Sequence, residues 1–402
     1  MTAAYDSPEA ASWLPLAVTL SIQAMVAMAQ ITVPVMAPQV ATSLGISAAL
    51  VGVFVSIAYV GAMLASLTGG MAVTRWGAMR VSQWGLFVCA CGLVLCMTGW
   101  LPAMLPGALL VGLGYGPITP ASSHLLARTT APHQMSLVFS IKQTGVPVGY
   151  MLGGAIVPSL MLMTGWQESL AIVAAVCVLC ALVSQPLQAG FDGDRNPSQT
   201  VRLSSLVEPI RLVLAHRSLA TMAACSFMFC MVQMSLTTYL VTFLHTELAY
   251  GLVAAGLVLS FSQMGGVTGR ILWGLVADRW LGAFRTLVLL AGLMALSALA
   301  TALFTPQVPR ALVIAVLVVF GASAIGWNGV YLAEVARRAP PGQASLATGG
   351  TLAFTFTGGL IGPSMFGGLS SLFGSYRTGF LALMAIAMTS AALLLWNHRR
   401  GR

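Results

Sequence analysis

Apolar stretches long enough to cross a membrane follow one another along almost the whole chain of 402 residues. A helix needs about 20 predominantly apolar residues to cross the hydrocarbon core of a bilayer. Only 7% of the residues are charged, whereas a soluble domain carries roughly a quarter. The sequence therefore predicts an all-α integral membrane protein of twelve transmembrane helices. Hydrophobic windows place the spans near 13–37, 47–73, 81–99, 103–127, 136–163, 167–187, 218–244, 251–277, 284–303, 311–336, 344–372 and 378–396.

One long polar stretch divides these spans into two sets of six. It covers about 188–217 and carries charges of both signs. We therefore expect an N-terminal six-helix bundle over 1–187, a cytoplasmic linker over 188–217, and a C-terminal six-helix bundle with a short cytoplasmic tail over 218–402.

The two sets repeat each other in sequence. The stretch from Gly70 reads GMAVTRWGAMR and the stretch from Gly274 reads GLVADRWLGAFR, each between the second and third span of its set. Further along, ARTTAPHQMSL over 127–137 matches ARRAPPGQASL over 336–346. Two unrelated landmarks that recur in the same order indicate a duplication, and hence two pseudo-symmetric bundles.

The eighteen basic residues predict how the chain lies in the membrane. They occur in ones and twos near span ends and not as a stripe, so the formal net charge of +9 does not indicate a nucleic-acid partner. With the N-terminus inside, fourteen of them lie on the cytoplasmic side and two, Arg310 and Arg377, lie outside. This split follows the positive-inside rule. We expect a multi-pass protein of a bacterial-type inner (plasma) membrane, in contact with the lipid bilayer and with both termini in the cytoplasm.

The sequence offers little to support an enzyme. The seven cysteines all fall in apolar runs, so we interpret them as small buried residues and not as redox or metal-binding groups. We expect no metal and no cofactor, and we find no nucleophile–base set or phosphate loop. The first apolar run, from Leu14 to Met36, is longer than the apolar core of a cleaved signal, so we expect it to remain as a helix.

The loops that begin at Gly70 and Gly274 resemble the Gly-x-x-x-Asp-Arg-x-x-Gly motif of the major facilitator superfamily, and the resemblance covers the whole chain. It implies a transporter built of two six-helix bundles that works as a monomer. It also implies that each loop forms a latch of the cytoplasmic gate. The first copy departs from the motif because Thr74 stands in place of the aspartate. The resemblance therefore implies gating roles for Asp278, Arg279 and Arg285 in the second copy and for Arg75 and Arg80 in the first.

Charged side chains within a span cost at least ~2.5 kcal/mol each, so they are candidates for function. Two are clear, Lys142 and Arg270, and both are cationic. At 1.5 Å per residue, each lies about 9–11 Å inside the cytoplasmic boundary. We hypothesise that the two together bind a carboxylate-bearing substrate, with a bidentate contact from Arg270. In the alternative, Lys142 extends to the headgroups and Arg270 bonds to helix carbonyls.

The span around Arg270 is similar to that of monocarboxylate and oxalate/formate transporters of the same superfamily. In those carriers an arginine four residues before the glycine of the loop binds the carboxylate, and Arg270 and Gly274 keep this spacing. The monocarboxylate carriers place a proton-coupling aspartate four residues before the arginine. Gly266 stands there in this chain, which puts proton coupling by that route in doubt.

Two titratable groups have more than one interpretation. Glu334 is the only carboxylate within a span, and it is either a gate partner of Arg337, Arg338 or the Asp278 loop, or a proton carrier. His124 is either a hydrogen-bonded core residue or a group that titrates during transport.

Other polar and aromatic residues of the spans are candidates for shaping a substrate pocket, although a residue of this kind more often forms a helix–helix hydrogen bond than a ligand contact. They are Tyr59, Tyr115, Gln233, Trp327, Asn328 and Tyr331, with Asn328 beside Trp327 the preferred pair.

These observations favour a secondary transporter of a small organic anion, with a monocarboxylate as the expected substrate, that works by alternating access and is driven by proton symport or anion exchange. The alternative is a drug or metabolite efflux antiporter, which embedded carboxylates would have favoured. A membrane sensor or assembly factor that transports nothing is a third class, but no stretch is long enough for a soluble signalling domain.

Overall fold

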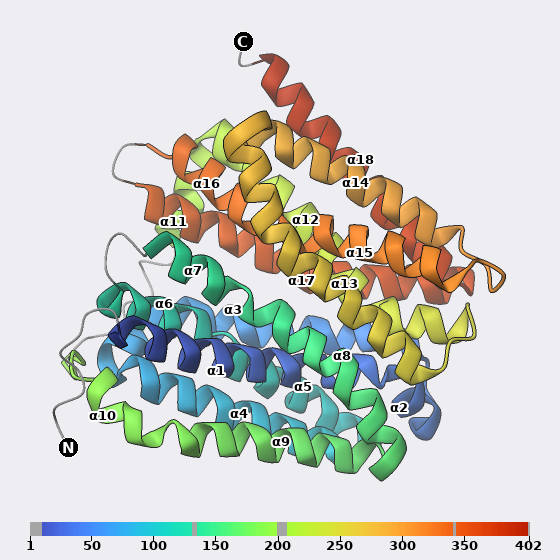
Figure 1. The fold of residues 1–402 in the computed structure, drawn as a ribbon, viewed down its shortest axis with the longest axis horizontal. Coiled ribbons are helices and arrows are strands. Elements are labelled where there is room, and N and C mark those ends of the chain that lie inside the picture. The colour runs from blue at the N-terminus through green and yellow to red at the C-terminus, as the bar shows by residue number, and fades with distance from the viewer. Residues whose placement is uncertain (1–9, 131–134, 199–206, 341–342, 401–402) are drawn as a thin grey trace. The chain divides into compact units, whose positions relative to one another are not determined.

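The computed structural model describes residues 10–130, 135–198, 207–340 and 343–400, and almost all of them are helical (Figure 1). The first half contains α1 (Ala10–Val35), α2 (Ala37–Leu44), η1 (Ala48–Leu50), α3 (Val51–Trp76), α4 (Ala78–Met97), α5 (Leu101–Tyr115), α6 (Ile118–Thr129), α7 (Met135–Gln143), α8 (Gly145–Thr164) and α9 (Trp166–Val183). Then follow η3 (Gln185–Leu187), α10 (Gln188–Phe191) and α11 (Val207–Ala215). The second half contains α12 (Arg217–Thr246), α13 (Leu252–Val276), η5 (Ala277–Leu281), α14 (Gly282–Ala302), α15 (Arg310–Gly326), α16 (Asn328–Arg338), α17 (Ala344–Phe373) and α18 (Tyr376–Arg400).

Within the described residues, 11 helical stretches are long and apolar enough to cross a membrane. One of them, Leu252–Ala302, is 51 residues long and contains both α13 and α14. Because about 20 residues suffice for one crossing, this stretch supplies two spans and brings the number to the predicted twelve. The prediction of an all-α membrane fold is confirmed.

The chain divides into two compact units. Unit 1 comprises Met1–Thr32, Val60–Gly153 and Leu160–Arg202. Unit 2 comprises Val33–Tyr59, Gly154–Ser159 and Leu203–Arg402. Two short segments of the first half thus belong to unit 2. The predicted linker 188–217 contains α10 and α11, and its residues 199–206 lie outside the described part of the chain.

Glycines let the helices of unit 1 approach one another closely. A Cβ atom added at Gly85 of α4 would lie 2.6 Å from the Gly114 carbonyl oxygen of α5, and one at Gly92 would lie 2.6 Å from that of Gly107. Helix α4 also packs against α9. Without a hydrophobic force between helices in lipid, such close backbone contacts hold membrane helices together.

The helices of unit 2 pack in the same way. Helix α13 packs against α15, and α12 packs against α17. At the first contact, a Cβ atom on Gly269 would overlap the Ala322 carbonyl oxygen. At the second, one on Gly362 would lie 2.7 Å from the Met231 Cα atom. The arrangement joins helices that are distant in sequence, and it brings Arg270 of α13 beside the C-terminal end of α15.

Two spans are broken at equivalent positions of the repeats. The stretch Leu101–Thr129 breaks between α5 and α6, where Pro117 precedes the new helix. The stretch Arg310–Arg338 breaks between α15 and α16, at Trp327. A break within a span is tolerated where the backbone groups it frees find partners inside the protein. The break at Trp327 lies beside Arg270, so this side chain is close to backbone groups that the break frees.

Candidate functional site

Arg270 lies at the break between α15 and α16 in unit 2. Its side chain is half-buried, and its Nε atom donates a hydrogen bond to the Ile325 carbonyl oxygen at 3.3 Å. The backbones are in close contact here, since a Cβ atom added at Gly326 would lie 3.2 Å from the Arg270 nitrogen. A hydrogen bond from Arg270 to a helix carbonyl is what the structural interpretation of this residue predicts. It uses one of the five N–H donors of a guanidinium and fixes the direction of the group.

Three of the predicted pocket residues form one buried cluster beside this break. The Trp327 indole Nε1 donates to the Gln233 Oε1 atom at 3.0 Å. The Trp327 ring also meets the rings of Phe229 and Tyr331 edge to face, with centroids 5.5 and 5.2 Å away. Gln233 is 9% exposed, whereas Trp327 and Tyr331 are 1% exposed. The cluster therefore fixes where α16 begins.

The other two pocket candidates of unit 2 are placed differently. Asn328 is half-buried and is the first residue of α16, directly after Trp327. Tyr59 is buried, with its hydroxyl 2.9 Å from the Met234 sulfur and its ring against Gly359. Tyr59 thus contacts α12 and α17 and not the cluster around Trp327.

Lys142 is buried in unit 1 at the break between α7 and α8. It is only 2% exposed, so it does not extend to the headgroups as the alternative interpretation requires. Its Nζ atom donates to the Ser123 hydroxyl at 3.2 Å and to the Thr119 carbonyl oxygen at 3.4 Å. The Thr119 hydroxyl in turn donates to the Gln23 Oε1 atom at 3.4 Å. Tyr115, also of unit 1, ends α5 just before the neighbouring break and is half-buried.

A clasp of linker residues closes one end of unit 1, which we call the linker end. The Asp192 carboxylate accepts hydrogen bonds from the backbone N–H groups of Met79 at 2.7 Å and Arg80 at 3.0 Å, and so caps α4. The Asn196 backbone N–H donates to the Thr74 carbonyl oxygen at 2.7 Å. Burial raises the pKa of Asp192, although the two N–H groups and the Arg80 charge oppose this shift.

His124 belongs to the same clasp. Its Nε2 atom lies 2.6 Å from the Asp194 Oδ2 atom, and Arg128 forms an ion pair with the other oxygen of Asp194. Of the interpretation of His124 as a hydrogen-bonded core residue, the core position is wrong because the side chain is 36% exposed, whereas the hydrogen bond is present, to Asp194 of the linker. Partial burial of Asp194 is outweighed by His124 and Arg128, which lower the pKa of its carboxyl group.

The remaining predicted gating residues of the first loop lie close by. Arg75 is exposed and stacks over the Trp76 ring at 5.4 Å from its centroid. Arg80 is half-buried at the start of α4.

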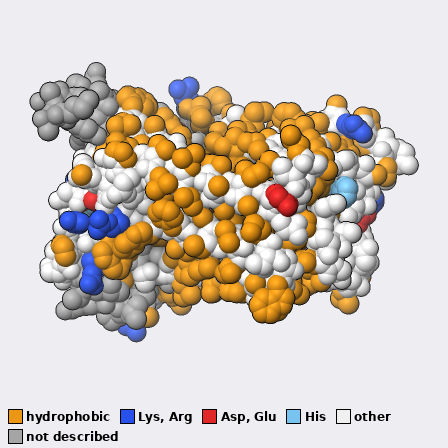
Figure 2. Space-filling view, turned by 90° about the horizontal axis from the view of Figure 1, so that it is seen from below, with side chains coloured by type: hydrophobic (Ala, Val, Ile, Leu, Met, Phe, Trp, Pro, Cys, Tyr) orange, Lys and Arg blue, Asp and Glu red, His pale blue; other side chains and the backbone are white. Residues whose placement is uncertain are grey.

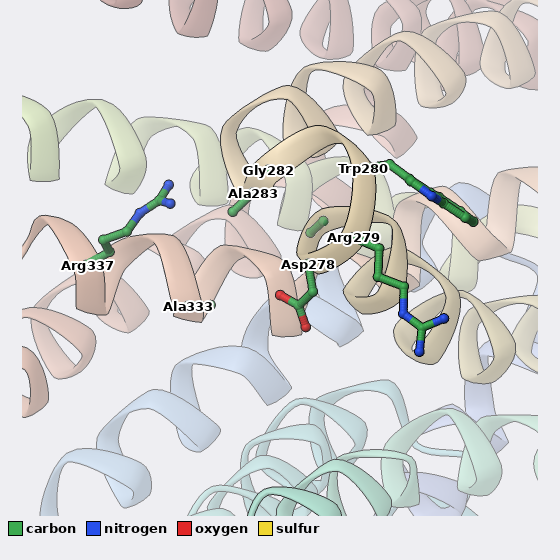
Figure 3. A pocket seen from close by; sticks show the side chains of 8 residues that line it. Asp278, Arg279, Trp280, Gly282, Ala283, Ala333 and Arg337 are labelled. Carbon is green, nitrogen blue, oxygen red and sulfur yellow. The ribbon is translucent and has the colours of Figure 1, made fainter.

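The second loop forms a different structure in unit 2. Asp278 and Arg279 lie on the π-helical turn η5, and they line a cavity of about 400 Å³ together with Arg337 of α16. Figure 3 shows Asp278, Arg279 and Trp280 projecting in different directions from this turn. Glu334 is 2% exposed and pairs with Arg337 and Arg338, and its Oε1 atom lies 2.6 Å from Arg338. Arg285 is exposed on α14.

Sequence reasoning missed the roles of Asp192 and Asp194, which it placed only as linker charges. The signal was present in the first loop, which lacks the motif aspartate at Thr74 and begins α4 after a glycine that offers no capping side chain. A helix start without a cap leaves backbone N–H groups in need of an acceptor. Nothing in the sequence says that the acceptor comes from residues more than a hundred positions away.

Comparisons with known proteins agree with this architecture. The sequence profile of the Major Facilitator Superfamily matches residues 19–363. The chain is 24% identical over 320 residues to a benzoate transport protein of Acinetobacter baylyi, a match covering 72% of this chain and 68% of that protein. It is 25% identical over 290 residues to an uncharacterized MFS-type transporter of Mycobacterium tuberculosis, covering 71% and 63% of the two chains.

Solved structures show the same fold. A nucleoside transporter superposes with a TM-score of 0.80 at 15% identity, covering 94% of this chain and 99% of that one. A bacterial homologue of the human lysosomal transporter Spinster gives 0.77 at 16% identity, covering 96% and 97%. The family profile spans most of the sequence, and both bundles are present as that family has them. This chain is therefore a transporter of the Major Facilitator Superfamily.

Proposed function

We propose that the protein is a secondary transporter of a small organic anion, with a monocarboxylate as the expected substrate, and that it works by alternating access. The observation that carries the proposal is Arg270, a half-buried guanidinium inside a membrane-crossing stretch and beside a break in the neighbouring span. A charge at this depth is costly and is kept where it binds something. The similarity to a benzoate transport protein supports a carboxylate as the ligand.

In this proposal Arg270 makes the bidentate contact with the substrate carboxylate, because a planar guanidinium matches the two carboxylate oxygens. The start of α16 is held in place by Gln233, Trp327 and Tyr331, and Asn328 lies directly after Trp327 at a half-buried position. Further candidates for substrate binding are Lys142 and Tyr115 of unit 1 and Tyr59 of unit 2, each described within its own unit.

Orientation, gating and coupling are part of the same proposal. The basic residues of the linker end support a protein of the inner membrane with both termini in the cytoplasm, following the positive-inside rule. The proposed gating residues are Arg75, Arg80 and His124 in unit 1 and Asp278, Arg279, Arg285, Glu334 and Arg337 in unit 2. Proton symport or anion exchange supplies the driving force, and a monomer is the transporting species.

Ligand-induced thermal stabilisation of the purified protein tests the proposal. A ligand that binds only the folded state raises the apparent melting temperature by mass action. The panel contains aliphatic and aromatic monocarboxylates, dicarboxylates, nucleosides and lipophilic cations, with wild type, Arg270→Ala and Arg270→Lys run in parallel. We expect stabilisation by a monocarboxylate, its loss in Arg270→Ala, and an affinity at least about tenfold weaker in Arg270→Lys, which keeps the charge but not the fork of donors.

Arg211→Ala is the matched control, because Arg211 is an exposed arginine of α11 in the same unit. It should bind the same carboxylate as wild type. Equal stabilisation of all four proteins by neutral or cationic compounds would make Arg270 a structural residue and would favour the efflux antiporter.

A further inference from the structure

A second cavity lies at the linker end of unit 1, and of the residues that line it only Arg80 is also a proposed gating residue. Its volume is about 510 Å³. It lies where α4 begins and where the chain leaves α9 through η3 and α10, and α4 and α9 pack against each other. The residues that line it are Arg80, Gln185, Gln188, Ala189, Asp192, Gly193 and Arg195.

The wall of this cavity attracts anions. It carries two guanidinium groups, Arg80 and Arg195, and one carboxylate, Asp192. Both oxygens of that carboxylate already accept backbone N–H groups at the start of α4. The amide of Gln188, turned so that its oxygen faces Arg80, accepts from Arg80 Nε at 2.8 Å and from Nη2 at 2.9 Å. The Arg80 guanidinium is therefore held in place at the cavity, and Arg195 is an exposed cation beside it.

An exposed apolar surface covers the two helices below the cavity. On α9, the side chains of Leu179, Leu182 and Val183 are 58%, 56% and 69% exposed. On α4, Trp84 is 46% exposed, one turn after Arg80. The face that bears α9 in Figure 1 is covered by hydrophobic side chains over its middle, and basic side chains gather at one edge (Figure 2). In a membrane protein such a surface lies against acyl chains.

Aromatic residues mark the level at which this surface meets the headgroups. Trp84 and Trp76 pack edge to face with their centroids 5.4 Å apart, and Arg75 stacks on Trp76. Tryptophan is enriched at the membrane–water interface because its ring is apolar and its N–H is polar. The cavity thus lies at headgroup depth, with basic residues around it and acyl-chain surface beneath it.

We propose that this cavity binds the phosphate headgroup of an anionic phospholipid, with the acyl chains of that lipid along α4 and α9. Guanidinium groups bind phosphate oxygens through charge-assisted, often bidentate hydrogen bonds. The assignment of this lipid to the cytoplasmic leaflet is the one part of the proposal that rests on the proposed orientation. Anionic lipids are enriched in that leaflet. The identity of the transported substrate plays no part in the argument.

Lipid titration of the purified protein tests the site. Phosphatidylglycerol and phosphatidylcholine with the same acyl chains are added to protein in neutral detergent, and bound lipid is counted by native mass spectrometry. We expect phosphatidylglycerol to bind preferentially to wild type and about tenfold more weakly to Arg195→Gln, because one charge-assisted contact is lost. Arg195→Lys, which keeps the charge, should bind at an intermediate level.

Arg211→Gln is the control, since it removes an exposed cation that does not line the cavity. It should retain wild-type binding. Equal binding of phosphatidylglycerol to wild type and Arg195→Gln overturns the proposal. So does full competition by inorganic phosphate at millimolar concentration, which would show a site for a free anion. Carboxylate-induced stabilisation, measured on the same Arg195→Gln protein, should equal that of wild type, so that loss of lipid binding is distinguished from failure of the transport proposal.

Discussion

The two loops between the second and third spans of each repeat begin with almost the same sequence and end as different structures. In the first, α3 ends at Trp76 and α4 begins at Ala78 after Gly77, which has a φ of +99°. In the second, the π-helical turn η5 occupies Ala277–Leu281 before Gly282, which has a φ of +75°. Both glycines adopt a conformation that other residues rarely adopt. Only Gly77 faces a carboxylate, that of Asp192.

Two sequence differences account for the contrast. The second loop has one residue more, Leu281, between the tryptophan and the glycine. A single extra residue in a helix is accommodated by a π-helical turn. The first loop lacks the acid, and Asp192 and Asp194 of the linker lie at the same end of unit 1 instead. A family motif can therefore lose its charged residue where another part of the chain supplies a carboxylate nearby.

The largest effect should come from Gly77, with Gly282 as its comparison. Gly77→Ala imposes left-handed strain and also brings the new Cβ atom into Asp192, so it should lower the free energy of unfolding by about 2–4 kcal/mol. Gly282→Ala imposes the strain alone, at a cost of about 1 kcal/mol, because nothing lies within 4 Å of its added Cβ atom. Chemical unfolding in detergent measures both. Equal losses of unfolding free energy in the two variants would show that the linker residues around Gly77 move to accommodate the added Cβ atom.

The next effect concerns the capping carboxylate. Asp192→Asn should destabilise the protein by about 1–2 kcal/mol, because the amide nitrogen that replaces one carboxylate oxygen leaves one of the two backbone N–H groups at the start of α4 without its acceptor. Asp278→Asn is the control, since Asp278 is exposed on η5 and should change stability by less than about 0.5 kcal/mol. Apparent melting temperatures of the two variants compare them directly. A larger shift for Asp278→Asn would reverse the assignment of the structural carboxylate.

Deletion of Leu281 makes the second loop as long as the first. We expect the π-helical turn to become α-helical and the free energy of unfolding to fall by about 1 kcal/mol. The shortened loop would resemble the first one, but no carboxylate equivalent to Asp192 would cap the start of α14. Hydrogen exchange of the backbone amides over 277–285, read with the melting temperature, reports both changes. Unchanged exchange in this segment would mean that Leu281 does not cause the π-helical turn.

The smallest effect depends on pH. His124 and Arg128 lower the pKa of Asp194 against the opposing effect of burial, so the ionised form is favoured by folding. The resulting stabilisation is complete above the pKa of an unfolded aspartate and disappears as the pH falls through the lower folded value. Asp194→Asn should therefore cost less than about 1 kcal/mol at pH 7, because the group is partly exposed, and almost nothing at strongly acidic pH. A constant difference across the pH range would contradict this linkage.

Sequence reasoning predicted the helical membrane fold because each span carries its own apolar signal. It did not predict the break at Trp327, because an apolar run looks the same whether the helix is continuous or broken. The inward position of the Trp327 ring depends on Gln233, 94 residues earlier. Such long-range contacts leave no local periodicity in a sequence.

The clasp also decides where this chain tolerates a foreign domain. Between Phe191 and Asn196 the backbone is held at Asp192, Asp194 and Asn196 against helices from three other parts of unit 1. A fusion protein inserted there would break the hydrogen bonds by which Asp192 caps α4. Inserted after Asn196, the same fusion would leave every one of these contacts in place. The useful junction for a crystallisation chaperone or a fluorescent reporter therefore begins several residues later than the end of α9 suggests.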